Sequence, residues 1–441
     1  MSLLRVRFAV GLILVGHGAQ QERRWGSNVE VLLTRPDRVV LALALGAIVL
    51  VIAYGAYLAP DWDRARDDQV QYLSLARGLV ERGEYTRASG AEPFIPEPLR
   101  FPGYPLFLAP LCVVGCAPWL IAVAQAVLLG ALVLLVAHVA RPLVGPRGAR
   151  VAAALVALHP AFAFFAAHAL SDVLASLLAM VTVVVAPTLA RSRGGIAAGA
   201  FAAATALTRP FLVFTLPVAA IAIGRDRGAR AIAGGLAVAA IVFCVVVSPY
   251  IAYVERSFGQ PVVGSTGAQL WLGYFQGHDE RGLDAFERGQ ADAGRAALAR
   301  FDAVGDRVAQ AQAFVVLDDE LRSRALGLIG HDPLGFAGRG VARSVQLWAG
   351  DIPLRPEHAT GAATALWVIA NLVLLGLGIV GAARLARRGG GTFAIPLLVI
   401  VATWVLSYPL WAEGRFSLPA RPFLAIGVAA LIEDLAHGRR A

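Results

Sequence analysis

The segment RARDDQVQYLSLARGLVERGEY, residues 64–85, follows an apolar run at residues 39–59 that is long enough to cross a membrane. From Asp68 onward, apolar side chains recur with the spacing of one α-helical face, at Tyr72, Leu75, Ala76, Leu79 and Val80. The opposite face is polar and carries Gln69, Arg77, Glu81 and Arg82. This pattern predicts a helix that lies on the membrane surface directly after a transmembrane span.

The composition is that of a membrane protein. Of the 441 residues, 58% are hydrophobic and 16% are charged, whereas soluble domains have about 45–50% apolar and about 25% charged residues. The mean hydropathy is +0.66. The net charge of +9 comes from arginine alone, because the sequence contains no lysine. These arginines fall in short loops between apolar runs, which indicates a role in membrane topology and not in binding nucleic acid.

Apolar runs of about membrane-spanning length, roughly 20 residues, occur along the whole chain. They are residues 39–59, 119–140, 151–168, 173–189, 196–207, 211–223, 231–253, 363–383, 393–410 and 417–432. The two runs on either side of Arg209 and Pro210 are short. We therefore expect an all-α, polytopic integral membrane protein with roughly ten to eleven transmembrane helices, together with interfacial helices in the first outward loop.

The arginines occupy alternate loops, and the positive-inside rule places those loops in the cytoplasm. The loops that then face outward are residues 60–101, 169–172, 208–210, 255–361 and 411–416. We predict a cytoplasmic leader at residues 1–38 and a transmembrane core at residues 39–254. A helical outward loop at residues 255–361 and C-terminal transmembrane helices at residues 362–441 follow.

Three cysteines occur, Cys112, Cys116 and Cys244, all within apolar sequence. No histidine or second cysteine pair lies near Cys112 and Cys116, so a zinc site is not indicated. Core packing is favoured over a disulfide between these two residues.

The first outward loop contains residues that suit chemistry. Asp67 and Asp68 lie in the first turn of the predicted helix, where the helix dipole favours the ionised carboxylate that a general base needs. Helix capping alone would also explain an aspartate there. The sequence PLRFPGYPLFLAPL, residues 98–111, is apolar but broken by prolines, and it returns Arg100 toward the membrane. Arg100 would there either bind a phosphate or extend its guanidinium to the interface.

These motifs resemble the first extracytoplasmic loop of bacterial GT-C glycosyltransferases, in the family 39 or protein O-mannosyltransferase-like group that includes aminoarabinose transferases. Further resemblances follow in the same order along the chain. They are SDVLASLL from Ser171, ALTRPFLVFTLP from Ala206, STGAQLWLGYFQG from Ser265 and EGRFSLPARPFLA from Glu413. Gln269 stands where the family usually has Asn, and Phe275 and Gln276 replace a Gly-Asn step.

The resemblance implies an inverting transferase that moves a sugar from a polyprenyl-phosphate donor to a hydroxyl of a lipid, glycan or protein acceptor. It would act on the outer face of a bacterial cytoplasmic membrane. Asp68, which matches the family's spacing to Tyr72, is the expected general base, and Asp67 is an additional carboxylate beside it. Arg100 and then Arg415 are the candidates for binding the donor phosphate.

The remaining site candidates are Tyr72, Tyr104 and Glu413, which we expect to position the substrate; for Tyr72, simple packing is an equal alternative. No cofactor is indicated, and a divalent metal is left open. The alternative function is a polytopic lipid or glycan transporter or flippase, but transporters usually place ionisable residues near the middle of the membrane. Here the predicted spans are nearly free of charge.

Overall fold

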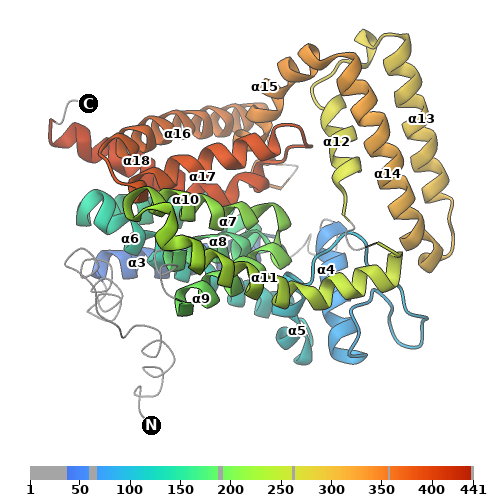
Figure 1. The fold of residues 1–441 in the computed structure, drawn as a ribbon, viewed down its shortest axis with the longest axis horizontal. Helices are drawn as coiled ribbons and strands as arrows, with labels where there is room; N and C mark the ends of the chain where they lie inside the picture. The colour runs from blue at the N-terminus through green and yellow to red at the C-terminus, as the bar shows by residue number, and fades with distance from the viewer. Residues whose placement is uncertain (1–36, 59–66, 187–191, 261–263, 356–357, 439–441) are drawn as a thin grey trace.

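The computed structural model describes residues 37–58, 67–186, 192–260, 264–355 and 358–438 (Figure 1). Every regular element in these ranges is a helix, which confirms the all-α prediction. In chain order they are α3 Arg38–Leu58, α4 Asp67–Glu81, α5 Gly103–Val113, α6 Pro118–Ala157, α7 Pro160–Ala166, α8 Asp172–Val185, α9 Ser192–Thr208, η3 Pro210–Phe214, α10 Thr215–Arg227, α11 Ala229–Phe258, α12 Thr266–Phe275, η4 Glu280–Gly282, α13 Ala285–Asp302, α14 Arg307–His331, α15 Pro333–Ala349, α16 Gly361–Arg387, α17 Gly391–Ser407, η6 Gly414–Ala420 and α18 Arg421–Ala436.

Five helical segments of the described chain are long and apolar enough to cross a membrane, which makes this a multi-pass membrane protein. They are Arg38–Leu58, Pro118–Ala157, Ile232–Phe258, Gly361–Arg387 and Gly414–Ala436. Three shorter helices, α5, α8 and α17, are also apolar. The pair α9 and α10, beside Arg209, is short as expected. The count of ten to eleven spans and the domain boundaries stay predictions, and the leader predicted for residues 1–38 lies almost wholly outside the described residues.

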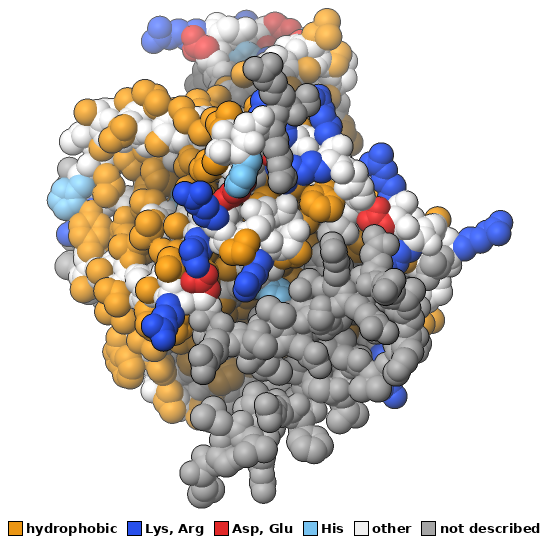
Figure 2. All heavy atoms as spheres, turned by 90° about the vertical axis from the view of Figure 1, so that its left-hand side faces the viewer, with side chains coloured by type: hydrophobic (Ala, Val, Ile, Leu, Met, Phe, Trp, Pro, Cys, Tyr) orange, Lys and Arg blue, Asp and Glu red, His pale blue; other side chains and the backbone are white. Residues whose placement is uncertain are grey.

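The helices differ in how much of their surface is buried within the bundle. The segment Gly414–Ala436, which comprises η6 and α18, is central, because 83% of its apolar window is buried, whereas only 17% of the window in α11 is buried. Large apolar side chains such as Val49, Ile241 and Leu366 are exposed on the outer helices, as lipid-facing residues are. Figure 2 shows one end of the molecule, where several arginine side chains gather and apolar side chains flank them.

Helices α12 to α15 form a second, smaller core around Trp271, Phe314 and Leu321. Figure 1 shows α12, α13 and α14 at one end of the molecule, with α15 leading back to α16. The buried guanidinium of Arg343 connects this group to the bundle. It donates hydrogen bonds to the carbonyl oxygens of Phe336, Gly273 and Tyr408, on α15, α12 and the segment after α17. These bonds fix the outward helices relative to the last loop.

Two sequence-based expectations were wrong. The sulfurs of Cys112 and Cys116 are joined in a disulfide, although we expected both cysteines only to pack in the core. Instead of continuing as a helix, the chain turns after α5 through positive φ angles at Gly115 and Cys116, which brings the two Cα atoms to 4.0 Å.

Gln69, expected on the polar face of α4, is buried. Its side-chain oxygen accepts a hydrogen bond from the backbone amide of Ala169, at 2.8 Å.

Helices α16 and α18 cross so closely that glycine is required at the contact. A Cβ on Gly381 would collide with the carbonyl oxygen of Gly427, whereas Gly376 on the same helix faces open space.

We predict that Gly381→Val destabilises the protein by about 1–3 kcal/mol, the range found for overpacked sites, and that Gly376→Val has little effect. Melting curves of both variants in detergent check this. Equal melting temperatures would contradict the close crossing.

Candidate active site

Helix α4 forms as its periodicity predicts and places Asp68 at its N-terminal end. The predicted apolar face is confirmed, because Tyr72, Leu75 and Ala76 are buried. Asp68 itself remains partly accessible, with 18% of its side chain exposed. Asp67 is the first residue of α4, but its side chain lies outside the described part of the structure, so its catalytic role stays a prediction.

Arg100 is held beside Asp68 by the loop between α4 and α5. One Nη of Arg100 pairs with a carboxylate oxygen of Asp68, and its Nε donates to the side-chain oxygen of Gln71, at 2.8 Å. These two contacts hold the guanidinium of Arg100 at Asp68, and its role in binding a phosphate stays a prediction.

Glu97, which the sequence analysis did not identify, shapes this loop. Its carboxylate is fully buried and accepts hydrogen bonds from the backbone amides of Leu99 and Arg100, at 2.5 and 2.9 Å. Its other oxygen pairs with Nε of Arg87, at 2.9 Å. The loop that carries Arg100 is therefore built around a buried ion pair.

Arg415 approaches Asp68 from the other end of the chain. Its Nη1 lies 2.7 Å from the second carboxylate oxygen of Asp68, and its Nε donates to Glu413, at 2.5 Å. Glu413 also accepts a hydrogen bond from the indole Nε1 of Trp411, at 3.2 Å. Helix η6, which carries Arg415, packs so closely on the carbonyl of Gly350 that its first residue, Gly414, has no room for a side chain.

The two guanidinium groups set the charge state of Asp68. Burial by itself would raise the pKa of the Asp68 carboxyl, but Arg100 and Arg415 together outweigh burial and hold this pKa below its ordinary value. Because a carboxyl is ionised above its pKa, Asp68 is a carboxylate at neutral pH and at mildly acidic pH. This is the protonation state that a general base requires.

Arg209 is a third arginine of the site, and it was not among the predicted site residues. It follows α9 at the bend before Pro210, and it pairs through Nη2 with Asp172, at 2.6 Å, and through Nε with Ser171, at 3.2 Å. Asp172 is fully buried, so this pair orients the guanidinium firmly. In the sequence, the feature that could have identified Arg209 as a site residue is its position as an isolated charge at the end of a long apolar stretch.

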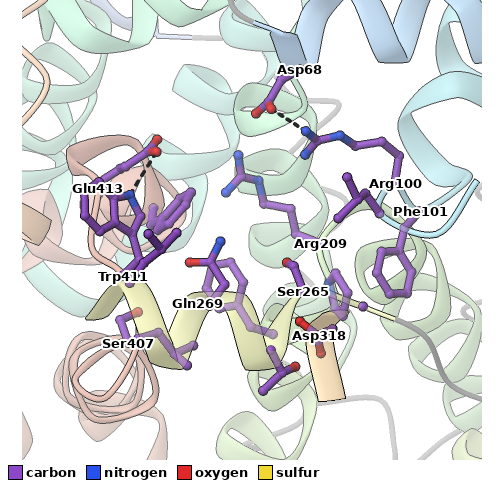
Figure 3. Close-up of a pocket in the computed structure, with 18 of the residues that line it drawn as sticks. Asp68, Arg100, Phe101, Arg209, Ser265, Gln269, Asp318, Ser407, Trp411 and Glu413 are labelled. Atoms are coloured by element: carbon purple, nitrogen blue, oxygen red, sulfur yellow. Dashed lines mark hydrogen bonds and ion pairs between the residues drawn. The ribbon is translucent and has the colours of Figure 1, made fainter. Parts of the chain in front are cut away.

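A cavity of about 720 Å³ joins these elements. It is lined by all three arginines and by Asp68, Tyr72 and Glu413 on one side, and by residues of α12 and α14 on the other (Figure 3). In each guanidinium one nitrogen, Nη1 of Arg100, Nη1 of Arg209 and Nη2 of Arg415, forms no hydrogen bond with any residue that the structure describes. An apolar pocket of about 240 Å³ between α9, η3 and α11 adjoins the cavity and shares Phe101 and Pro210 with it.

Of the two predicted tyrosines, one lines the cavity and the other is buried behind it. Tyr72 lines the cavity, its hydroxyl lies 3.4 Å from that of Ser171, and the guanidinium of Arg100 lies 5.5 Å from its ring centroid. Tyr104 is fully buried and packs edge-to-face on Tyr72 at 4.9 Å between centroids. Tyr104 therefore supports Tyr72 from behind and is not part of the cavity lining.

The sequence matches no protein-family model and no curated protein. The structure is similar to that of the Archaeoglobus fulgidus oligosaccharyltransferase in its apo form, with a TM-score of 0.52 and 14% identity over 90% of this chain and 51% of that one. The structure of the archaeal oligosaccharyltransferase AglB from Archaeoglobus fulgidus, in complex with an inhibitory peptide and a dolichol-phosphate, gives a TM-score of 0.51 and 12% identity over 90% of this chain and 51% of that one. A further structure of this oligosaccharyltransferase contains Zn and sulfate.

ArnT from Cupriavidus metallidurans, bound to undecaprenyl phosphate, shares 15% identity over 90% of this chain and 78% of that one, with a lower TM-score of 0.40. The present chain spans about half the length of the archaeal enzyme. The comparison shows that this chain shares the fold of part of the archaeal oligosaccharyltransferase. It does not by itself assign an activity to this chain.

The residues around Asp68 do not suit a divalent cation. Magnesium and its relatives need several oxygen ligands, but both carboxylate oxygens of Asp68 already face guanidinium groups. Within the described ranges, no three His, Cys, Asp or Glu side chains converge on a common point. The carboxylates of Asp68, Asp172 and Glu413 balance the three arginines in charge. Each guanidinium nevertheless leaves one nitrogen without a partner among the described residues, and such nitrogens suit the oxygens of an anion.

Replacing Glu97 tests how the Arg100 loop is built. Glu97→Gln keeps the shape and the acceptor for the two backbone amides but leaves Arg87 without its counter-charge. Since breaking a buried ion pair is strongly destabilising and Arg87 is partly exposed, we expect a loss of about 2 kcal/mol. The exposed Glu92→Gln is the matched control, and both are compared by melting in detergent. A melting temperature of Glu97→Gln equal to that of the control would contradict this account.

Proposed function

We propose that the protein is a membrane glycosyltransferase that transfers a sugar from a polyprenyl-phosphate donor to a hydroxyl group of a lipid, glycan or protein acceptor. The observation that carries the proposal is the placement of one ionised carboxylate, Asp68, among three arginines in a single cavity. A site with this composition suits a reaction in which an anionic phosphate leaves while a nearby base takes up a proton.

In the proposed reaction, the acceptor hydroxyl gives its proton to Asp68 as its oxygen attacks the anomeric carbon of the sugar. The bond between that carbon and the phosphate oxygen breaks, and the lipid phosphate leaves with the electron pair. Attack from the side opposite the phosphate inverts the anomeric centre. The nitrogens of Arg100, Arg209 and Arg415 that lack protein partners in the described part of the chain would bind the phosphate and stabilise its growing charge.

The neighbouring apolar pocket supports a lipid-linked donor. Its lining includes Phe101, Phe243 and Tyr250, and it meets the cavity beside Arg100 and Arg209. A polyprenyl chain in this pocket would bring its phosphate to the guanidinium groups. The transporter alternative lacks comparable support, because Asp68 and all three arginines come from loops and helix ends.

We further propose that the cavity faces outward from a bacterial cytoplasmic membrane. The arginine-rich loops would then lie in the cytoplasm under the positive-inside rule. The arginines at the end shown in Figure 2 support this orientation.

Substituting the proposed base tests the function. Asp68→Asn removes the proton acceptor with little change in volume, and we expect glycan transfer to fall by about 10²–10⁴-fold, the range for loss of a general base. The measurement is restoration of the missing surface glycan in a deletion strain, followed by mass spectrometry, and Asp67→Asn is measured beside it to show which of the two carboxylates is the base. Full restoration by Asp68→Asn would refute the proposed mechanism.

The pH dependence tests the electrostatics of the same group. In Arg100→Gln, burial of Asp68 is opposed by one guanidinium fewer, so the pKa of Asp68 rises. The acid limb of kcat/KM, where activity disappears as the base becomes protonated, must then move to higher pH than in the wild type. Arg322→Gln, which removes an arginine that pairs with Asp318 and Asp319 instead, is the control. An unchanged acid limb in Arg100→Gln would show that Asp68 is not the titrating base.

A further inference from the structure

The wall of the cavity opposite Asp68 has a different chemistry from the arginine side. Helix α12 presents Ser265 and Gln269 there, and the segment before η6 presents Trp411. Figure 3 shows the amide of Gln269 pointing into the cavity on the side of Arg209. The side chains of Ser265 and Gln269 form no hydrogen bond with any residue in the described ranges. This part of the wall therefore offers neutral donors and acceptors.

The amide of Gln269 is unpaired on a backbone that is firmly held. The carbonyl of Gln269 accepts a hydrogen bond from the backbone amide of Trp411, at 2.9 Å. At the C-terminal end of α12, the side chain of Gln276 bonds both the amide and the carbonyl of Ala412, each at 2.8 Å. The buried carboxylate of Asp318 binds the first amides of α12, at 3.0 and 2.9 Å. A rigid helix thus presents to the cavity an amide with no protein partner among the described residues, which leaves its donor and acceptor available to a ligand.

Trp411 adds an apolar surface next to this amide. Its indole nitrogen is held by Glu413, which fixes the direction of the ring. The cavity wall then combines an amide, which both donates and accepts hydrogen bonds, with a large aromatic side chain. A sugar ring has hydroxyl groups around its edge and carbon-bound hydrogens on its faces, so the two surfaces are complementary to it.

The position of this wall indicates that it would contact the sugar of the donor and not the acceptor. In the proposed reaction the donor phosphate lies at the guanidinium groups, and its lipid extends into the apolar pocket beside Phe101 and Pro210. The sugar, bonded to the other side of the phosphate, must extend away from that pocket. The wall formed by α12 lies across the cavity.

Resting on the proposed function, we propose that Gln269 and Trp411 form the subsite for the sugar ring of the donor. Gln269 binds its hydroxyl groups, and Trp411 packs against its apolar face. These two residues then distinguish a sugar-bearing lipid phosphate from the bare lipid phosphate that remains after transfer.

Binding to the full-length protein in lipid nanodiscs tests this subsite without requiring the acceptor. The probes are undecaprenyl phosphate and undecaprenyl phosphate carrying glucose, mannose or arabinose, measured by native mass spectrometry. For the wild type, we expect at least one sugar-bearing lipid to bind more tightly than the bare lipid. Gln269→Leu should lose about five- to tenfold of that preference, as expected for one or two hydrogen bonds, while its affinity for undecaprenyl phosphate stays within twofold.

Two further variants keep the test decisive. Gln310→Leu, on α14 and outside the cavity lining, is the matched control and should behave as the wild type. Gln269→Asn retains the amide but shortens its reach, so it should show a weaker preference even if Gln269→Leu does not fold.

The outcomes separate this inference from the proposed function. Equal affinity of the wild type for all four lipids, or an unchanged preference in the folded Gln269 variants, would overturn the sugar subsite. The proposed function would still stand if undecaprenyl phosphate binds and Arg100→Gln weakens that binding. Failure of undecaprenyl phosphate to bind at all would overturn both.

Discussion

The ion pairs of Asp68 with Arg100 and Arg415 connect the two ends of this protein. Asp68 and Arg100 belong to the first loop of the chain, whereas Arg415 belongs to the last one, and one carboxylate holds both guanidinium groups. Such partly buried charges are stable only while every partner is in place. The cavity therefore depends on the correct placement of α4 relative to η6, which this ion pair connects.

Periodicity and motif spacing predicted the local part of this arrangement. The 3.6-residue pattern was sufficient to predict α4 and its buried face at Tyr72, Leu75 and Ala76. The motifs were sufficient to select Asp68, Arg100 and Arg415 as site residues. Gln69 was misassigned because a local pattern contains no information about distant backbone groups. Its amide side chain is buried only because the turn before α8 leaves the amide of Ala169 in need of an acceptor.

The residues that were missed are those whose roles depend on tertiary contacts. Glu97 and Asp172 are ordinary acidic residues in the sequence, and only the fold buries them against Arg87 and Arg209. Gln276 departs from the family pattern, and the structure gives a reason, since its side chain binds the backbone of Ala412. Arg209 was the exception, because a single charge within an apolar stretch is itself a signal of function.

The central claim is that the three arginines bind the phosphate of a lipid donor beside an ionised Asp68. The most direct measurement is an experimental structure of the full-length protein in nanodiscs with undecaprenyl phosphate. We expect density for the phosphate within hydrogen-bond distance of Arg100, Arg209 and Arg415, with the lipid chain passing Phe101 and Pro210. A phosphate bound elsewhere, with the cavity beside Asp68 free of lipid, would contradict it.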